Sequence, residues 1–505
     1  MEEVLNDYLS ITSLKEESPQ NINIILGTIF EYSRELNSLE SLKEGIKKAS
    51  CIDLTEFKME DKMNFYYNLS NAWSYKKMLT QVPNSSKFWQ FENEELTQEI
   101  LNCRKALNYS KNSNDTNRKC EILTNLANDL NHLGRYSEAI ELWKKALELD
   151  DNFSMAIGNL GFGLFHYAQI IYDDWHKAYF LKEAYRNLNK IKDSEDIYDE
   201  AKVSFNEVIS IIEKQVNSDF LHSPNSFEEY SLGKTKDEIN YRKWCLENKL
   251  FLNPMNDVFK ENIVARDVLS LPTIVVKSTE KDIYNYHSFF NQIKQEFCSA
   301  RYFFYESTIN GNIHFSDREN FIIDTLDYAT YSFNLEKLKT SFRLFYSILD
   351  KIAYLINSYF KLGKKPFEVT FRKIWLEKKA INPKIENTQN WGLRGLYWLC
   401  RDFSEKDDLH SELEPEAKEL SSIRNFIEHK SFKIIEFGKS GISEDGFIYE
   451  IQRDDFIEKT FKLMKIIRAS IIYTSLTINL EEIKKVKHSK TGNIQLDIID
   501  DFFKN

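Results

Sequence analysis

The stretch NLANDLNHLGRYSEAIELWKKALELDD, residues 125–151, contains two short amphipathic runs on either side of one glycine. Small and large apolar side chains recur within it at three- and four-residue spacing, which is the period of one helix face. Gly134 stands between the two runs, where a tight turn favours a residue without a Cβ. The small residues allow two antiparallel helices to approach closely, and the large ones fill the groove between them. The stretch therefore predicts a helical hairpin.

This hairpin resembles a tetratricopeptide repeat (TPR). Nine residues fall where that repeat needs them: Leu126, Ala127, Leu130, Gly134, Tyr136, Ala139, Trp143, Ala146 and Leu147. One such repeat cannot bury its own faces, so several must stack. Weaker matches occur around Leu69 and Ala106 upstream, and from Ser154 downstream, where one long second helix is predicted over 177–215. We therefore expect residues 1–215 to form an irregular, TPR-like helical solenoid whose concave groove binds an unidentified protein partner.

The composition favours a mostly helical protein of two or three domains. The chain has 505 residues, 42% of them apolar, but only 15 Gly and 8 Pro to interrupt helices. Its six cysteines are scattered without a CxxC pair, which argues against a disulfide framework or a zinc site and fits a reducing compartment. The formal net charge of −11 repels nucleic acid at long range, so any contact with nucleic acid needs a local basic site.

The sequence predicts a cytoplasmic protein without a membrane segment or a cofactor. Its N-terminus, MEEVLNDYLS, lacks the basic-then-apolar pattern of a signal peptide. The best apolar run, IIRASIIYTSLTI at 466–478, is short and contains Arg468, so we expect a buried helix. The triplets GKT at 233–235 and GKS at 438–440 lack the earlier glycine of a phosphate loop, and neither is expected to follow a strand and open a helix. The histidines lack a second ligand at metal spacing, so no metal site is expected.

The C-terminal half predicts a helical bundle. Apolar residues at three- and four-residue spacing fill long runs such as FNLEKLKTSFRLFYSILDKIAYLINSYFKLG. Two alternating segments, FKIIEFG at 432–438 and GFIYEIQ at 446–452, flank a Ser/Gly/Asp stretch and indicate a small β-hairpin inserted before the last long helix. We expect a connector over 216–280 and the bundle over 281–505, so the fold class is all-α apart from this hairpin.

Residues 424–429, RNFIEH, place four polar side chains on the outward side of one helix: Arg424, Asn425, Glu428 and His429. A step of 100° per residue puts Ile423 and Phe426 on the opposite, core-facing side. Two interpretations are open. The first is a solvated face with one surface ion pair between Arg424 and Glu428, worth roughly a few tenths of a kcal/mol. The second is a catalytic cluster.

An arginine followed by a polar residue and, five positions on, by a histidine, on a late helix of a helical bundle, resembles the signature of HEPN domains. Many members of that superfamily are metal-independent endoribonucleases. The segments YRKWCLENKLFLNPMND, SARYFFYES and FYSILDKIAYLINSYF also resemble a HEPN subfamily that carries N-terminal TPRs. The resemblance implies that His429 moves protons while Arg424 stabilises the charge of the transition state. Asn425 is expected to orient His429 or to bind the phosphate, and Glu428 either positions Arg424 or is only its surface partner.

The resemblance also implies an RNA substrate and a homodimer formed through the HEPN bundle, because one chain supplies a single such histidine. Attack by the 2′-OH of RNA on the adjacent phosphate would give a 2′,3′-cyclic phosphate and a 5′-hydroxyl, and DNA would resist. Many relatives serve as bacterial toxins or in anti-phage defence, so such a role is implied as well. The alternative is a non-catalytic TPR/HEPN scaffold that dimerises and binds a protein partner.

Overall fold

The computed structural model is mostly helical, with a few short strands, which confirms the predicted fold class. It describes the following residues: 1–11, 14, 16–80, 89–275, 283–309, 313–378, 380–403, 417–486, 498–499 and 501–504.

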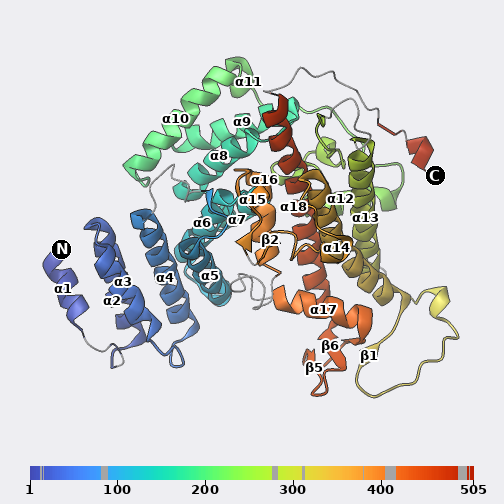
Figure 1. Ribbon diagram of the computed structural model, residues 1–505, viewed down its shortest axis with the longest axis horizontal. Coiled ribbons are helices and arrows are strands. Elements are labelled where there is room, and N and C mark those ends of the chain that lie inside the picture. The colour runs from blue at the N-terminus through green and yellow to red at the C-terminus, as the bar shows by residue number, and fades with distance from the viewer. Residues whose placement is uncertain are drawn as a thin grey trace.

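The N-terminal part is a series of stacked helices that arches from the N-terminus towards the C-terminal bundle (Figure 1). Its helices are α1 (Glu2–Ser10), α2 (Pro19–Glu35), α3 (Leu39–Ser50), α4 (Met59–Thr80), α5 (Glu94–Tyr109), α6 (Thr116–His132), α7 (Tyr136–Leu149), α8 (Ser154–Ala168), α9 (Asp174–Ile191) and α10 (Asp199–Gln215). Consecutive helices pack in pairs, α4 with α5, α6 with α7 and α8 with α9. The weak sequence matches around Leu69 and Ala106 lie on α4 and α5 and thus belong to one hairpin.

The predicted TPR hairpin is formed by α6 and α7. Its small residues Ala127 and Ala139 are fully buried, and the large Trp143 fills the space between the helices. The Trp143 indole N–H donates to Asn128 Oδ1 at 3.0 Å, which satisfies the one polar atom that this burial removes from water. Gly134 joins the helices with φ +84°, a left-handed conformation that favours glycine. The prediction of one helix over 177–215 is wrong, because the chain breaks between α9 and α10.

The C-terminal part is a bundle in which α13, α14, α16, α17 and α18 carry the core. Its elements are α13 (Ile283–Ile309), β1 (Ala329–Thr330), α14 (Phe333–Tyr359), β2 (Leu376–Glu377), β3 (Ala380–Ile381), α15 (Pro383–Glu386), α16 (Trp391–Arg401), α17 (Ala417–His429), β4 (Ser431–Ile435), β5 (Gly441–Ile442), β6 (Ile448–Gln452) and α18 (Arg453–Val486). The long helix α18 packs against α13, α14 and α16 and is the axis of the bundle. Two short helices, α11 (Ser218–His222) and α12 (Lys236–Glu247), lie in the connector.

The small sheet differs from the predicted hairpin. Its strand order is β1-β4-β6-β5, and β4 runs parallel to β6. A hairpin does exist, but it joins β5 to β6, with the turn at Gly446 (φ +67°). Twelve residues connect β4 to β6, and this connection is long enough to cross β6 and form β5 on its far edge. Strand β4 therefore has β6 on one side and β1, about a hundred residues upstream, on the other.

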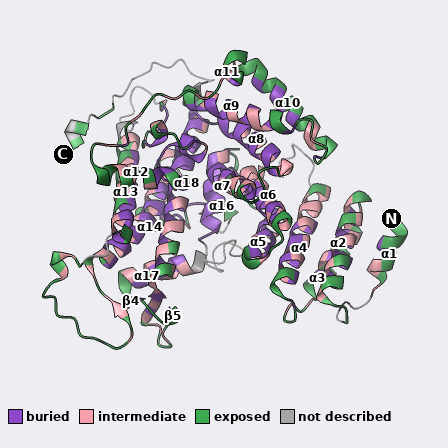
Figure 2. Cartoon of the chain, turned by 180° about the vertical axis from the view of Figure 1, so that it is seen from behind, coloured by how far each residue is buried: buried purple, intermediate pink, exposed green. Residues whose placement is uncertain are grey.

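The hydrophobic core runs without interruption from the N-terminal solenoid into the bundle. One cluster of buried side chains extends from Met63 on α4 to Ile478 on α18. A second, smaller cluster lies within α1–α4. Figure 2 shows the buried residues concentrated along α6–α9, α14, α16 and α18, with exposed residues at the rim. The two halves of the chain therefore fold against each other.

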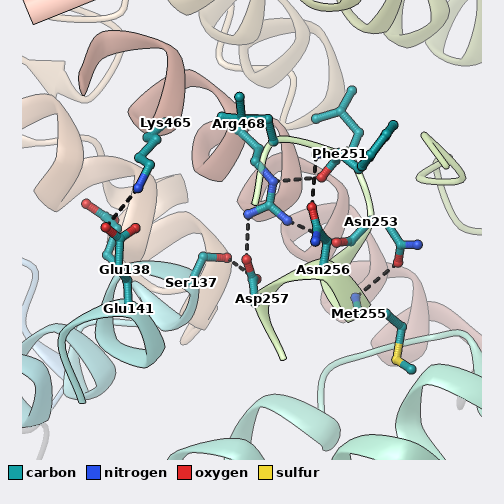
Figure 3. Close-up of polar contacts among 12 residues, drawn as sticks. Ser137, Glu138, Glu141, Phe251, Asn253, Met255, Asn256, Asp257, Lys465 and Arg468 are labelled. Carbon is teal, nitrogen blue, oxygen red and sulfur yellow. Dashed lines mark hydrogen bonds and ion pairs between the residues drawn. The ribbon is translucent and has the colours of Figure 1, made fainter. Parts of the chain in front are cut away.

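The connector supplies a polar junction between α7 and α18. Arg468 of α18 is 4% exposed and donates from Nη1 to Asp257 Oδ1 at 2.6 Å and from Nε to the Phe251 carbonyl at 2.7 Å (Figure 3). The Ser137 hydroxyl of α7 donates to the other oxygen of Asp257 at 2.8 Å. Arg468 thus lies in a buried helix, as predicted, and its charge is neutralised by the connector. Within the described residues, no helix is long and apolar enough to cross a membrane.

Helix α16 is buried between α18 and the solenoid, and glycine permits the approach. A Cβ on Gly134 would lie 2.3 Å from the Trp391 carbonyl oxygen, and one on Gly395 would lie 2.9 Å from the Gly134 carbonyl oxygen. The TPR turn and the first turn of α16 are therefore in backbone contact. The turn glycine recognised in the sequence also allows a helix of the bundle to dock.

We predict that Gly134→Ala destabilises the protein more than the same change at Gly363. Both glycines have left-handed φ values, +84° and +77°, and the left-handed conformation costs an alanine about 1–2 kcal/mol. A Cβ at Gly363 meets nothing within 4 Å, whereas one at Gly134 strikes the α16 backbone. Urea denaturation should show a further loss of about 1–3 kcal/mol for Gly134→Ala. Equal losses at both positions would contradict the docking of α16 on this turn.

Candidate active site

Helix α17 carries the RNFIEH segment and is anchored by one apolar face. Leu420, Ile423 and Phe426 are buried, and the Phe426 ring makes an edge contact with Tyr449 of β6 at 5.4 Å between centroids. The helix ends at His429, and β4 begins two residues later. The predicted core side of the helix is therefore correct, and the sheet fixes the end of the helix that carries the histidine.

Arg424 is half-buried and faces α14. Its guanidinium carbon lies 5.9 Å from the centre of the Tyr346 ring, within cation–π range. Its Nη1 donates to Oδ1 of the adjacent Asn425 at 3.1 Å. Within one copy Asn425 therefore contacts the arginine, and its roles of orienting His429 or binding the phosphate stay predictions. The Asn425 side chain is exposed, so its amide nitrogen faces solvent.

Two residues that sequence reasoning did not place in the site come from α14. Tyr346 and Asp350 are four residues apart and therefore share one face of that helix. Asp350 accepts from the Phe371 N–H at 2.9 Å. Burial raises the pKa of Asp350, while that hydrogen bond and the positive charge of Arg424 act in the opposite direction. The i, i+4 spacing was visible in the sequence, but nothing local showed that this face meets Arg424.

Glu428 and His429 are exposed, and neither has a hydrogen bond or ion pair within the described part of the chain. The predicted ion pair between Arg424 and Glu428 is therefore not formed, because Arg424 turns towards Tyr346 and Asn425 instead. Glu428 is left as a surface carboxylate. The His429 imidazole projects into solvent beside Lys430, whose ammonium donates to the Gly446 carbonyl at 2.8 Å.

The guanidinium and the imidazole do not converge within one chain. Arg424 and His429 are five positions apart, which places them about 140° apart around the helix axis and roughly 7.5 Å apart along it. Arg424 lies on the flank next to α14, and His429 lies at the helix end on the other flank. A single copy therefore displays the two groups without bringing them to one point.

The first phosphate-loop triplet proved to be a helix cap. GKT at 233–235 opens a helix, since α12 begins at the next residue, but it follows no strand in the described chain, so it lacks the predicted requirement of a phosphate loop. The Thr235 hydroxyl accepts from the Glu238 N–H, and the Glu238 carboxylate accepts from the Lys234 N–H at 2.8 Å. This reciprocal cap uses an amide that a phosphate would need. The GKS triplet lies between β4 and β5 and opens no helix. No group of three potential metal-binding His, Cys, Asp or Glu side chains occurs among the described residues.

The comparison with protein families assigns the two parts of the chain. Residues 277–481 match the family described as LA2681-like HEPN, and residues 120–153 match a tetratricopeptide repeat. Residues 277–481 therefore form a HEPN-like domain, and a tetratricopeptide repeat lies N-terminal to it. The HEPN match extends from α13 into the last turns of α18 and includes α17 with all four candidate site residues. The TPR match covers most of α6 and all of α7. The comparison with curated proteins finds no match.

Proposed function

We propose that this protein is a metal-independent endoribonuclease whose HEPN domain cleaves RNA, and that its TPR region targets or regulates the cleavage. The HEPN superfamily includes ribonucleases, and the chain carries such a domain. The observation that carries the proposal is the exposed end of α17, where His429 is free and Arg424 is held by Tyr346 and Asn425. The bacterial toxin or anti-phage role that the resemblance implies belongs to the same proposal.

The chemistry needs two proton transfers and one site for negative charge. In the first step the RNA 2′-oxygen loses its proton to a base and bonds to the adjacent phosphorus. The bond to the 5′-oxygen breaks, and an acid protonates that oxygen. Imidazole suits both proton transfers, because its ordinary pKa lies near neutrality. The guanidinium of Arg424 is a fork that matches the phosphate oxygens on which charge accumulates.

A second copy of the chain would complete the site. One copy provides a single exposed imidazole at the end of α17, whereas the reaction uses a base and an acid. Two copies related by a two-fold axis, with their α17 ends adjacent, would supply two His429 and two Arg424 side chains around one phosphate. The surroundings favour an anionic substrate locally, since residues 421–440 contain four basic side chains and only two acidic ones.

The link between the solenoid and the site is α16. This helix precedes α17 in the chain and contacts the solenoid at two points. Its backbone lies against the Gly134 turn, and Nη1 of Arg401 donates to the Thr97 hydroxyl of α5 at 3.0 Å. A partner that binds the solenoid therefore has a packed route to α17 through α16, α18 and α14. This supports a regulatory role for the TPR region.

The test is cleavage of a labelled oligoribonucleotide by the purified full-length protein in the presence of EDTA. We expect products with a 2′,3′-cyclic phosphate and a 5′-hydroxyl. An oligonucleotide with a single 2′-deoxy position should be cut everywhere except after that position, because the attacking hydroxyl is missing there. Intact RNA under all conditions, including with a cell extract that can supply an activator, would instead favour the non-catalytic scaffold. Cleavage that EDTA abolishes would contradict the metal-independent mechanism.

A further inference from the structure

Residues 313–332, here called the arm, form an exposed apolar segment next to the candidate active site. The arm leaves the lower end of the bundle as a wide loop and returns to the sheet at β1 (Figure 1), and Figure 2 shows it as exposed along its length. Phe321 is 94% exposed, Leu326 85% and Ile323 84%. Other large apolar side chains of the arm are exposed too: Phe315, Ile322 and Tyr328. A continuous exposed group of this size marks an interaction surface.

The backbone of the arm is held only at its ends. Residues 318–326 are all exposed, and Glu319 and Leu326 have left-handed φ values of 60° and 54°. A leucine in that conformation costs about 1–2 kcal/mol. This conformation is supported locally, since the Leu326 N–H donates to Asp324 Oδ1 at 2.8 Å. Nothing in the described part of this chain covers the outer side of the arm.

The root of the arm is fixed to the strand that follows His429. Strand β1 pairs with β4, and the Lys433 ammonium of β4 forms an ion pair with Asp327. Tyr328 makes an edge contact with the ring of Phe437 at 5.9 Å, and Phe437 is itself exposed. Within one chain, one acidic and one aromatic side chain of the arm therefore contact a basic and an aromatic side chain at β4 and just after it.

We propose that the arm docks on a second copy of this chain, and that this contact brings the two α17 ends together. The inference rests on the proposed function, because it assigns the surface that completes the nuclease site. Apart from Asp327 and Lys433, which pair within one chain, the arm carries three carboxylates and one arginine, while residues 421–440 carry three basic and two acidic side chains. The arm of one copy and the α17–β4 face of the other are thus complementary in charge, and both display exposed aromatic rings. A two-fold axis uses each contact twice.

RNA is the less suitable occupant of this surface. After the aromatic Phe321, the most exposed side chains of the arm are the aliphatic Leu326 and Ile323, which cannot stack on bases as aromatic rings do. The carboxylates of Asp324 and Asp327 repel phosphates. An apolar segment bordered by acidic groups fits a protein surface, and the α17–β4 face of a second copy has the complementary charge.

The experiment measures the mass of the full-length protein in solution by light scattering, without RNA. We expect twice the chain mass for the wild type and the single chain mass for Phe321→Asp/Ile323→Asp. The matched control is Ile24→Asp/Val203→Asp, which places two charges at apolar positions on α2 and α10 that are 61% and 60% exposed. The control should keep the wild-type mass. Both pairs lie on the surface, so thermal melting should remain unchanged in all three proteins.

A wild type that is monomeric at every concentration overturns the inference, and so does an arm variant that keeps the wild-type mass. Loss of the dimer in the control but not in the arm variant would place the interface on the solenoid. Failure of the proposed function has a different signature, because a dimer that depends on the arm but leaves RNA intact would preserve the inference and remove the nuclease. RNA that binds the wild-type monomer and not the arm variant would assign the surface to RNA instead.

Discussion

Replacing His429 by alanine is expected to reduce RNA cleavage by roughly 10²–10⁴-fold, the usual contribution of general acid–base catalysis. The side chain is exposed and makes no polar contact in the described structure, so the substitution removes the proton carrier without disturbing the core. Arg424→Ala should cause a loss of similar size through the transition-state charge, on the order of 10²–10³-fold. The measurement is the single-turnover rate on a fluorescent oligoribonucleotide in EDTA.

Arg424→Lys separates charge from geometry. Lysine keeps the positive charge but loses the planar fork that bonds two phosphate oxygens at once and stacks on Tyr346. We expect a rate between those of the wild type and Arg424→Ala. The control, His287→Ala, removes a partly exposed histidine from the surface of α13 and should leave the rate unchanged. Wild-type rates for His429→Ala would place the chemistry elsewhere in the protein.

The helices could be read from the sequence because their signals are local. Nine positions within 22 residues defined the α6–α7 hairpin, and the buried Ala127, Ala139 and Trp143 have the roles that their sizes indicated. The outward placement of Asn425, Glu428 and His429 followed equally from the period of one helix. A helical repeat carries this information within a few turns, so tertiary contacts need only agree with it.

The error in the sheet arose because distant segments decide its structure, whereas the error in the solenoid had a local cause. The alternating segments around β4 and β6 fit a hairpin, but an alternating pattern does not reveal whether two strands pair parallel or antiparallel. In the structure β4 pairs with β6 in parallel, and β5 forms the antiparallel pair with β6. The contact of β1 with β4 joins segments about a hundred residues apart. The break between α9 and α10 falls at the polar run KDSED, residues 192–196, where the helix period also stops. That signal was present in the sequence and was outweighed by the apolar residues on either side.

The environment of Arg424 is the part of the site that no local pattern could supply. Its neighbours Tyr346 and Asp350 lie on α14, more than seventy residues upstream, and meet Arg424 because α17 packs directly on α14. The same holds for the junction between the solenoid and α16. Its charged residues are spread over the sequence as ordinary surface residues would be, yet they are buried together.

Asp402 is the centre of that junction. It caps the C-terminus of α16 and is 4% exposed. Its Oδ1 and Oδ2 accept from Arg104 of α5 at 2.8 and 3.1 Å, and Oδ2 also accepts from Arg135, the residue after the TPR turn glycine, at 2.6 Å. Arg135 in turn pairs with Glu138 of α7, which accepts from the Tyr473 hydroxyl of α18 at 3.3 Å. One carboxylate therefore joins two helical hairpins of the solenoid to the HEPN domain.

Asp402→Asn is expected to lower the free energy of unfolding by about 3–5 kcal/mol, the usual cost of removing one partner from a buried ion pair. Asparagine has nearly the same shape, so the loss comes from leaving the guanidinium groups of Arg104 and Arg135 buried beside a neutral amide. Urea denaturation of the full-length protein measures it. The control is Asp199→Asn on α10, whose side chain is 98% exposed and whose substitution should change stability by less than about 0.5 kcal/mol.

The pH dependence of the Asp402→Asn deficit tests its electrostatic origin. Burial raises the pKa of Asp402, but the charges and hydrogen bonds of Arg104 and Arg135 outweigh burial and lower it to about 2, from an ordinary value of 3.8. A carboxylate with a depressed folded-state pKa contributes stability that is fully present above its ordinary pKa and is lost as the pH falls through the folded value. The difference between wild type and Asp402→Asn should therefore be constant from pH 7 to pH 5 and shrink between pH 4 and pH 2. A difference that stays constant down to pH 2 would mean that asparagine disturbs packing rather than charge, and a difference near zero at pH 7 would show that the solenoid and the HEPN domain are held together without this carboxylate.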